Sequence, residues 1–222
     1  TPSRVIFEAD HLLIKRGLWS LLFGRSQYSF YCRAYEGDVR GKISFDKVPG
    51  GGLMDTEMTL EGLHIGGYPY FPDLIGRPVE GRLGGNVSYS GPTSSMLAGS
   101  GEAQLNVSDG RVELLQPFLT LKSIDFSEMK IDMALKEQNI NITRIALKGQ
   151  QLQGSLSGTV TLARDLGNST LNLRGEIQPF AALFKNTEGG VNTVALFKER
   201  LTKGTLSFEI NGTLKEPSIK FT

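Results

Sequence analysis

Apolar and polar residues alternate along most of this chain, and the pattern is clearest between residues 152 and 162. Every second residue there is apolar or glycine, and the residues between them are small or polar. Successive side chains of a β-strand point to opposite faces of a sheet, so the segment predicts a long strand with one apolar and one polar face. The apolar positions are Leu152, Gly154, Leu156, Gly158, Val160 and Leu162.

The same alternation recurs almost from end to end of the chain. Turn-forming residues separate the neighbouring segments, at 36–38, 49–52 and 91–95. Short connections of this kind favour an antiparallel meander, in which each strand pairs with the next in sequence. The other predicted strands carry alternating apolar or glycine positions at 5–9, 28–34, 39–45, 54–60, 83–89, 103–107, 131–135, 171–177 and 206–214.

Two kinds of local structure interrupt the predicted strands. Asp109 and Gly110 predict a tight hairpin between 105–107 and 112–114, because both residue types adopt the positive φ that such a turn requires. Helical signals are few, and the best is at 192–201, where Asn192 can cap a helix with apolar residues at helical spacing. Shorter helical or turn segments are expected at 17–23, 72–75 and 179–185.

A triplet of an apolar residue, a polar residue and glycine recurs at 60–62, 79–81, 147–149, 173–175 and 210–212. Glycine inside a strand marks a bulge, a tight bend or the close approach of another group. We expect these glycines to curve the sheet, and the approach of a ligand is the alternative. The predicted fold is mainly β, a large, strongly curved antiparallel meander that forms a groove or half-barrel, with one or two short helices.

The composition bounds the size and class of the protein. A chain of 222 residues is long enough for one large β domain, expected over 1–222 with a weak seam at 91–101. Its 24 basic and 23 acidic residues leave a net charge of +1, which gives no support to nucleic-acid binding. No apolar run approaches the ~18 residues of a membrane-spanning helix. The chain opens without methionine, so we expect a piece of a longer protein whose anchor or signal segment lies upstream.

Residues for catalysis, metal binding or cofactor binding are not found in recognisable patterns. The two histidines, His11 and His64, are far apart and lack the spacing of metal ligands. The segment 154–158 is similar to a nucleophile elbow but has leucine where the serine should stand. Cys32, the single cysteine, excludes an intrachain disulfide and is expected to be a small buried residue. We therefore expect no enzymatic activity, no metal and no cofactor.

Five segments together resemble one protein family. They read GLWSLLFG at 17–24, GDVRG at 37–41, DLIGRPVEGRL at 73–83, GQQLQGSLSG at 149–158 and INGTLKEP at 210–217. Their order resembles the type II secretion system protein N (GspN) family, which is itself similar to the AsmA-like envelope proteins. The resemblance covers nearly the whole chain.

The resemblance implies a location and a set of partners. It implies a periplasmic domain of an inner-membrane-anchored bacterial protein, and other type II secretion subunits as its partners. The similarity to AsmA-like proteins implies a curved β-groove that holds lipid acyl chains. The expected function is therefore a non-enzymatic periplasmic component of a type II secretion system, and the alternative is an AsmA-like groove for lipid binding or transfer.

The alternation itself is compatible with two arrangements. The apolar face is closed by a second sheet or by the helix at 192–201, or it stays an open trough that takes acyl chains. A sugar-binding module is disfavoured, because Trp19 is the only tryptophan and lies in an apolar segment. If the face is a trough, its predicted lining is Leu152, Leu156, Val160, Leu171, Leu173, Ile177, Leu206, Phe208 and Ile210.

Overall fold

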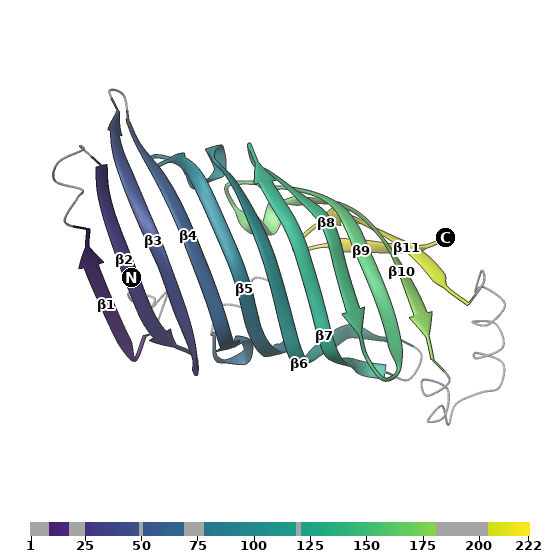
Figure 1. The fold of residues 1–222 in the computed structure, drawn as a ribbon. Helices are drawn as coiled ribbons and strands as arrows, with labels where there is room; N and C mark the ends of the chain where they lie inside the picture. The colour runs from purple at the N-terminus through teal and green to yellow at the C-terminus, as the bar shows by residue number, and fades with distance from the viewer. Residues whose placement is uncertain (1–8, 18–24, 49–50, 69–77, 119–120, 181–203) are drawn as a thin grey trace, which may run out of the picture.

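The computed structural model describes residues 9–17, 25–48, 51–68, 78–118, 121–180 and 204–222. In them, one antiparallel sheet of twelve strands follows the order of the sequence, β1 to β12 (Figure 1). The predicted mainly-β meander is confirmed. The strands are β1 (His11–Arg16), β2 (Arg25–Ala34), β3 (Gly37–Val48), β4 (Gly51–His64), β5 (Val79–Pro92), β6 (Ser100–Phe118), β7 (Leu121–Lys136), β8 (Asn139–Lys148), β9 (Leu152–Thr161), β10 (Thr170–Pro179), β11 (Leu206–Thr213) and β12 (Pro217–Phe221).

Helical structure within the described ranges is confined to three single turns of 3₁₀ helix. These are η2 (Ile65–Gly67), η3 (Met96–Ala98) and η4 (Leu166–Asn168), each in a connection between strands. The helix expected at 192–201 lies outside the described residues, as do 72–75 and most of 17–23 and 179–185. The sheet therefore has no second layer in the part of the chain that the structure describes.

Two of the hairpins are closed by pairs of residues with positive φ. Tyr35 and Glu36 join β2 to β3 with φ of 49° and 62°. Glu137 and Gln138 join β7 to β8 with φ of 46° and 69°. Positive φ at both central residues is the geometry of a type I′ turn, whose twist matches that of the strands it connects. The turn predicted at 36–38 is thus confirmed to within one residue.

The hairpin predicted at Asp109 and Gly110 is wrong, because β6 runs through both residues without turning. Asp109 does have a positive φ of 49°. It forms a bulge instead, since Asp109 and Gly110 together stand opposite the single residue Gly81 of β5. Along its other edge, β6 stays paired with β7 both before and after the bulge. The long neighbouring strand therefore holds β6 extended where the local sequence permits a turn.

The glycines of the repeated triplet contribute to the shape of the sheet. Gly62, with φ of 66°, lies where the β4–β5 register shifts between Leu60 and Leu63. Bulges of this kind bend a strand and increase its twist. The accumulated curvature is visible in Figure 1, where β10, β11 and β12 turn behind β8 and β9. The sheet remains open, with β1 at one edge and β12 at the other.

The weak seam expected at 91–101 does not interrupt the sheet. Residues 91–99 contain the end of β5 and the η3 turn, and β6 starts at Ser100. β5 and β6 pair along their length, from Ser90 with Ser100 to Val79 with Val112. The strands before and after the seam thus belong to one continuous sheet.

Candidate functional site: an apolar face across the sheet

The strand register aligns apolar residues into rows that cross the whole sheet. Two such rows contain only apolar residues or glycine at every one of the twelve strands. The first row is Ile14, Phe30, Gly41, Met58, Val87, Ala103, Met133, Ile142, Gly158, Leu173, Ile210 and Ile219. The second row is Leu12, Cys32, Val39, Leu60, Gly85, Leu105, Ile131, Ile145, Leu156, Gly175, Phe208 and Phe221.

The two rows lie on one face of the sheet, which we call the apolar face. Paired residues of neighbouring strands share a face, and residues two apart in a strand share it as well. No Asp, Glu, Lys or Arg stands in either row. Charged side chains are thus excluded from a band that runs from one sheet edge to the other.

All nine residues predicted to line a trough lie on this apolar face. In β9 and β10, Leu171 pairs with Val160, and Leu156 stands opposite Gly175. In β10 and β11, Leu173 pairs with Ile210 and Ile177 with Leu206. Alternation along three strands therefore assigned their faces correctly. Their role in lipid binding stays a prediction.

Part of the predicted lining forms a buried cluster at the C-terminal end of the face. Val160, Leu171 and Leu173 pack with Ile142 of β8, and each of the four is at most 9% exposed. Leu156 of the second row and Ile210 of the first row pack against this cluster. This buried cluster lies on the strands that turn back in Figure 1, β8 to β11.

Four residues of the predicted lining border a small hollow of about 170 Å³. Leu152, Leu156, Ile177 and Phe208 border it from β9, β10 and β11. Beside the hollow, Phe208 packs against Gly175 of the neighbouring strand, because a Cβ on Gly175 would stand 2.5 Å from Cζ of Phe208. The aromatic ring therefore lies directly over the glycine, which leaves no room for a larger side chain there.

Strands β7 and β8 contribute apolar residues that the sequence analysis did not assign to the site. Ile124, Ile145 and Leu147 border the same hollow. Ile142 and Ile145 share a face although they are three residues apart, because the β8 register shifts between them on both sides. A bulge at that point reverses which residues of β8 face the apolar side. The sequence of β8 therefore does not alternate strictly, and the pattern of alternation did not identify it.

A second apolar cluster lies further along the face, towards the N-terminal half of the chain. Ile65 of η2 packs there with Val79, Val107 and Phe126. The η2 turn thus covers one end of β5 and β6, beside the rows. Beyond the first row, Thr56 of β4 and Tyr89 of β5 pair with each other and place two polar side chains on the apolar face. Their hydroxyl groups are buried and have no hydrogen-bond partner among the described residues.

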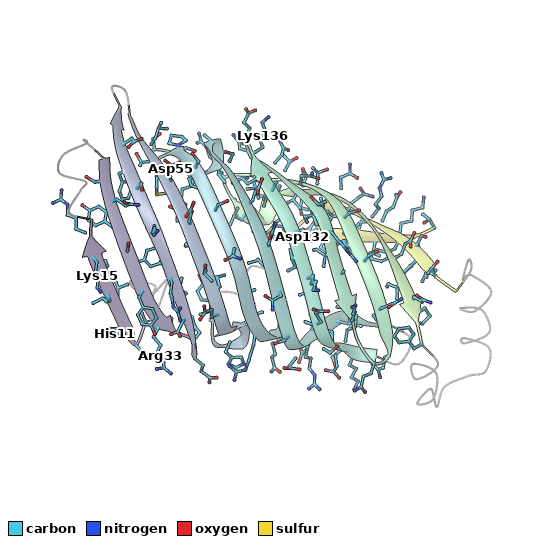
Figure 2. The ribbon with its side chains drawn as sticks, viewed as in Figure 1. His11, Lys15, Arg33, Asp55, Asp132 and Lys136 are labelled. Atoms are coloured by element: carbon cyan, nitrogen blue, oxygen red, sulfur yellow. The ribbon has the colours of Figure 1, made fainter. Side chains whose placement is uncertain are left out.

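The opposite face of the sheet carries the charges. Asp132, labelled in Figure 2 with Asp55 and Lys136, lies between Ile131 and Met133 of the two rows and therefore points to the opposite face. Ion pairs follow this face, including Arg40 with Glu61 at 3.0 Å. Lys130, which hydrogen-bonds Glu128, lowers the pKa of that carboxyl. These groups are exposed or half-buried and keep this face in water, and their ion pairs contribute little to stability.

The His, Cys, Asp and Glu side chains are dispersed over the described residues. No group of three or more His, Cys, Asp or Glu side chains among them could hold a metal ion. Burial raises the pKa of the Cys32 thiol, which keeps this side chain protonated and a poor nucleophile. Within the same ranges, no helix has the length and apolar character needed to cross a membrane.

Comparisons of the chain with models of protein families, with curated proteins and with solved structures found no match.

Proposed function

We propose that this chain binds the acyl chains of lipids along its apolar face, as a non-enzymatic protein of the bacterial cell envelope. The single observation that supports this is the pair of rows that cross twelve strands without a charged residue. Most of the central residues in these rows are only half-buried, such as Phe30, Met58 and Leu105. A continuous apolar surface of this length is unfavourable in water, so we expect a ligand, a partner or a membrane to cover it.

The dimensions of the face suit a hydrocarbon ligand. Neighbouring strands lie about 4.8 Å apart, so a row across twelve strands extends over roughly 50 Å. An acyl chain occupies about half of the ~30 Å hydrocarbon core of a bilayer, which is well within that length. A sheet with one apolar and one charged face can therefore shield an acyl chain while its other face stays in water.

A second proposed function follows from the resemblance to the GspN family. In this proposal the chain is a periplasmic component of a type II secretion system, anchored in the inner membrane and in contact with other subunits of that system. The support comes from the five quoted segments, two of which contribute to β9 and β11 on the apolar face. The two proposals are compatible, because a secretion component can also hold lipid.

Binding of a fluorescent fatty-acid analogue tests the lipid proposal. We expect the unaltered protein to bind the analogue and Leu156→Trp to weaken that binding roughly tenfold, about 1.4 kcal/mol, because the indole fills the 170 Å³ hollow. Ser157→Trp is the matched control, since residue 157 lies on the opposite face and should leave binding unchanged. Thermal melting verifies that both variants fold. Absence of binding by the unaltered protein, or equal binding by both variants, contradicts the proposal.

A further inference from the structure

A groove crosses the charged face of the sheet over strands β2 to β6. Its volume of about 670 Å³ is typical of sites that bind small molecules. Neighbouring strands lie about 4.8 Å apart, so the groove extends over roughly 19 Å. Two adjacent rows of side chains form its walls. The first wall is Ser29, Lys42, Glu57, Ser88 and Glu102, and the second wall is Tyr31, Arg40, Thr59, Asn86 and Gln104.

Contacts among its own side chains hold the second wall in place. The guanidinium group of Arg40 lies 5.9 Å from the centre of the Tyr31 ring and donates a hydrogen bond to Glu61 at 3.0 Å. The hydroxyl of Thr59 donates to the side-chain oxygen of Asn86 at 3.0 Å, which leaves the amide hydrogens of Asn86 for a ligand. Less conformational entropy is lost on binding when side chains are already ordered in this way.

The first wall carries polar side chains that are not engaged with the rest of the sheet. Lys42 stands opposite Glu57, and Ser88 stands between Glu57 and Glu102. All of them are exposed, as is Gln104 on the other wall. Among the described residues, the side chains of Lys42, Glu57, Glu102 and Gln104 form no ion pair and no hydrogen bond. Their donors and acceptors are therefore available to a ligand in the groove.

The chemistry of the walls favours a neutral ligand rich in hydroxyl groups. Hydrogen-bond donors and acceptors alternate along both walls, and a hydroxyl group pairs with either kind because it donates and accepts. Among the wall residues, Arg40 and Lys42 balance Glu57 and Glu102, so the groove has no net charge that favours an anion or a cation. The aliphatic parts of the Arg40 and Lys42 side chains add carbon surface for the C–H groups of a sugar ring.

We infer that this groove binds a linear, neutral oligosaccharide, laid across strands β2 to β6. The sequence disfavours a sugar-binding module that relies on stacked tryptophan rings, and the groove uses hydrogen bonds from its two walls instead. Each of these bonds replaces a bond to water, so the affinity is modest. The groove and the apolar face lie on opposite sides of the sheet. The inference therefore stands independently of the lipid proposal.

Isothermal titration calorimetry with linear hexasaccharides of glucose, xylose and N-acetylglucosamine tests this inference. We expect the unaltered protein to bind at least one of the three. Ser88→Trp should weaken that binding by at least about tenfold, because the indole fills the groove between Glu57 and Glu102. Ser157→Trp is the matched control, since Ser157 lies on the same face but on β9, outside the groove. It should bind the sugar like the unaltered protein.

Two further measurements complete the test. Binding should be the same at low and high salt, because the ligand is neutral. The Ser88→Trp protein should still bind the fluorescent fatty-acid analogue, which separates this site from the apolar face. Three results would overturn the inference: no binding of any of the three sugars, an equal loss of binding in Ser88→Trp and Ser157→Trp, or tighter binding of inorganic polyphosphate than of sugar. Circular dichroism verifies that each variant is folded.

Discussion

Replacing Leu156 with aspartate is expected to lower the free energy of unfolding by roughly 3 kcal/mol, from the cost of placing an unpaired charge in apolar surroundings. Leu156 packs against the buried cluster formed by Ile142, Val160, Leu171 and Leu173. It also borders the apolar hollow, where no cation is available to pair with the new carboxylate. The substitution therefore tests the assignment of the apolar face at its best-packed end.

The matched control for this prediction is Ser157→Asp, one residue further along β9. Ser157 lies on the charged face, where it stands directly opposite Arg174 of β10. A carboxylate there gains a cross-strand cation, so the free energy of unfolding should change by no more than about 0.5 kcal/mol. Urea denaturation of both variants measures the difference. Equal losses of stability would show that the two faces of β9 are assigned wrongly.

Replacing Gly158 with alanine is expected to destabilise the protein by at least roughly 2 kcal/mol. Gly158 has a φ of 136°, a conformation that residues with a side chain rarely adopt. An added Cβ would also collide with the carbonyl oxygen of Asn172 in the neighbouring strand, which is backbone and cannot rotate away. Backbone strain and collision act together at this position.

Gly154→Ala provides the comparison on the same strand and the same face. Gly154 has no positive φ, and the nearest atom to an added Cβ is the carbonyl oxygen of Glu176 at 3.2 Å. A shift of a few tenths of an ångström accommodates this contact, so the loss should stay below about 1 kcal/mol. Thermal melting of the two variants measures the contrast. Comparable melting temperatures would contradict the claim that the backbone conformation and close packing at residue 158 require glycine.

Much of the fold could be predicted from the sequence, because strand alternation is a local property. The regular alternation of β9, β10 and β11 assigns each side chain to a face without knowledge of its neighbours. The same local reasoning failed at Asp109, because a residue with positive φ occurs both in a hairpin turn and in a bulge. The continuous pairing of β6 with β7 makes Asp109 part of a bulge. It also missed β1, a short edge strand whose run Leu12, Leu13 and Ile14 does not alternate.

The rows of the candidate site could be predicted only in part. The nine predicted residues share a face because they lie on three strands of regular alternation. The continuation of their rows across the other strands depends on register, which turn lengths and bulges set together. At Ile142 and Ile145 a bulge changes the phase, and no local signal in the sequence fixes its position. The full extent of the apolar face is therefore a property of the assembled sheet.

The central claim is that the apolar face holds lipid, and native mass spectrometry with lipid extraction tests it most directly. The protein is purified from a bacterial host without detergent, and its native mass is compared before and after extraction with organic solvent. The account predicts additional masses that match bacterial fatty acids or phospholipids, which extraction removes and then yields as free lipid. A folded protein that shows only the mass of the bare chain, with no lipid in the extract, would contradict it.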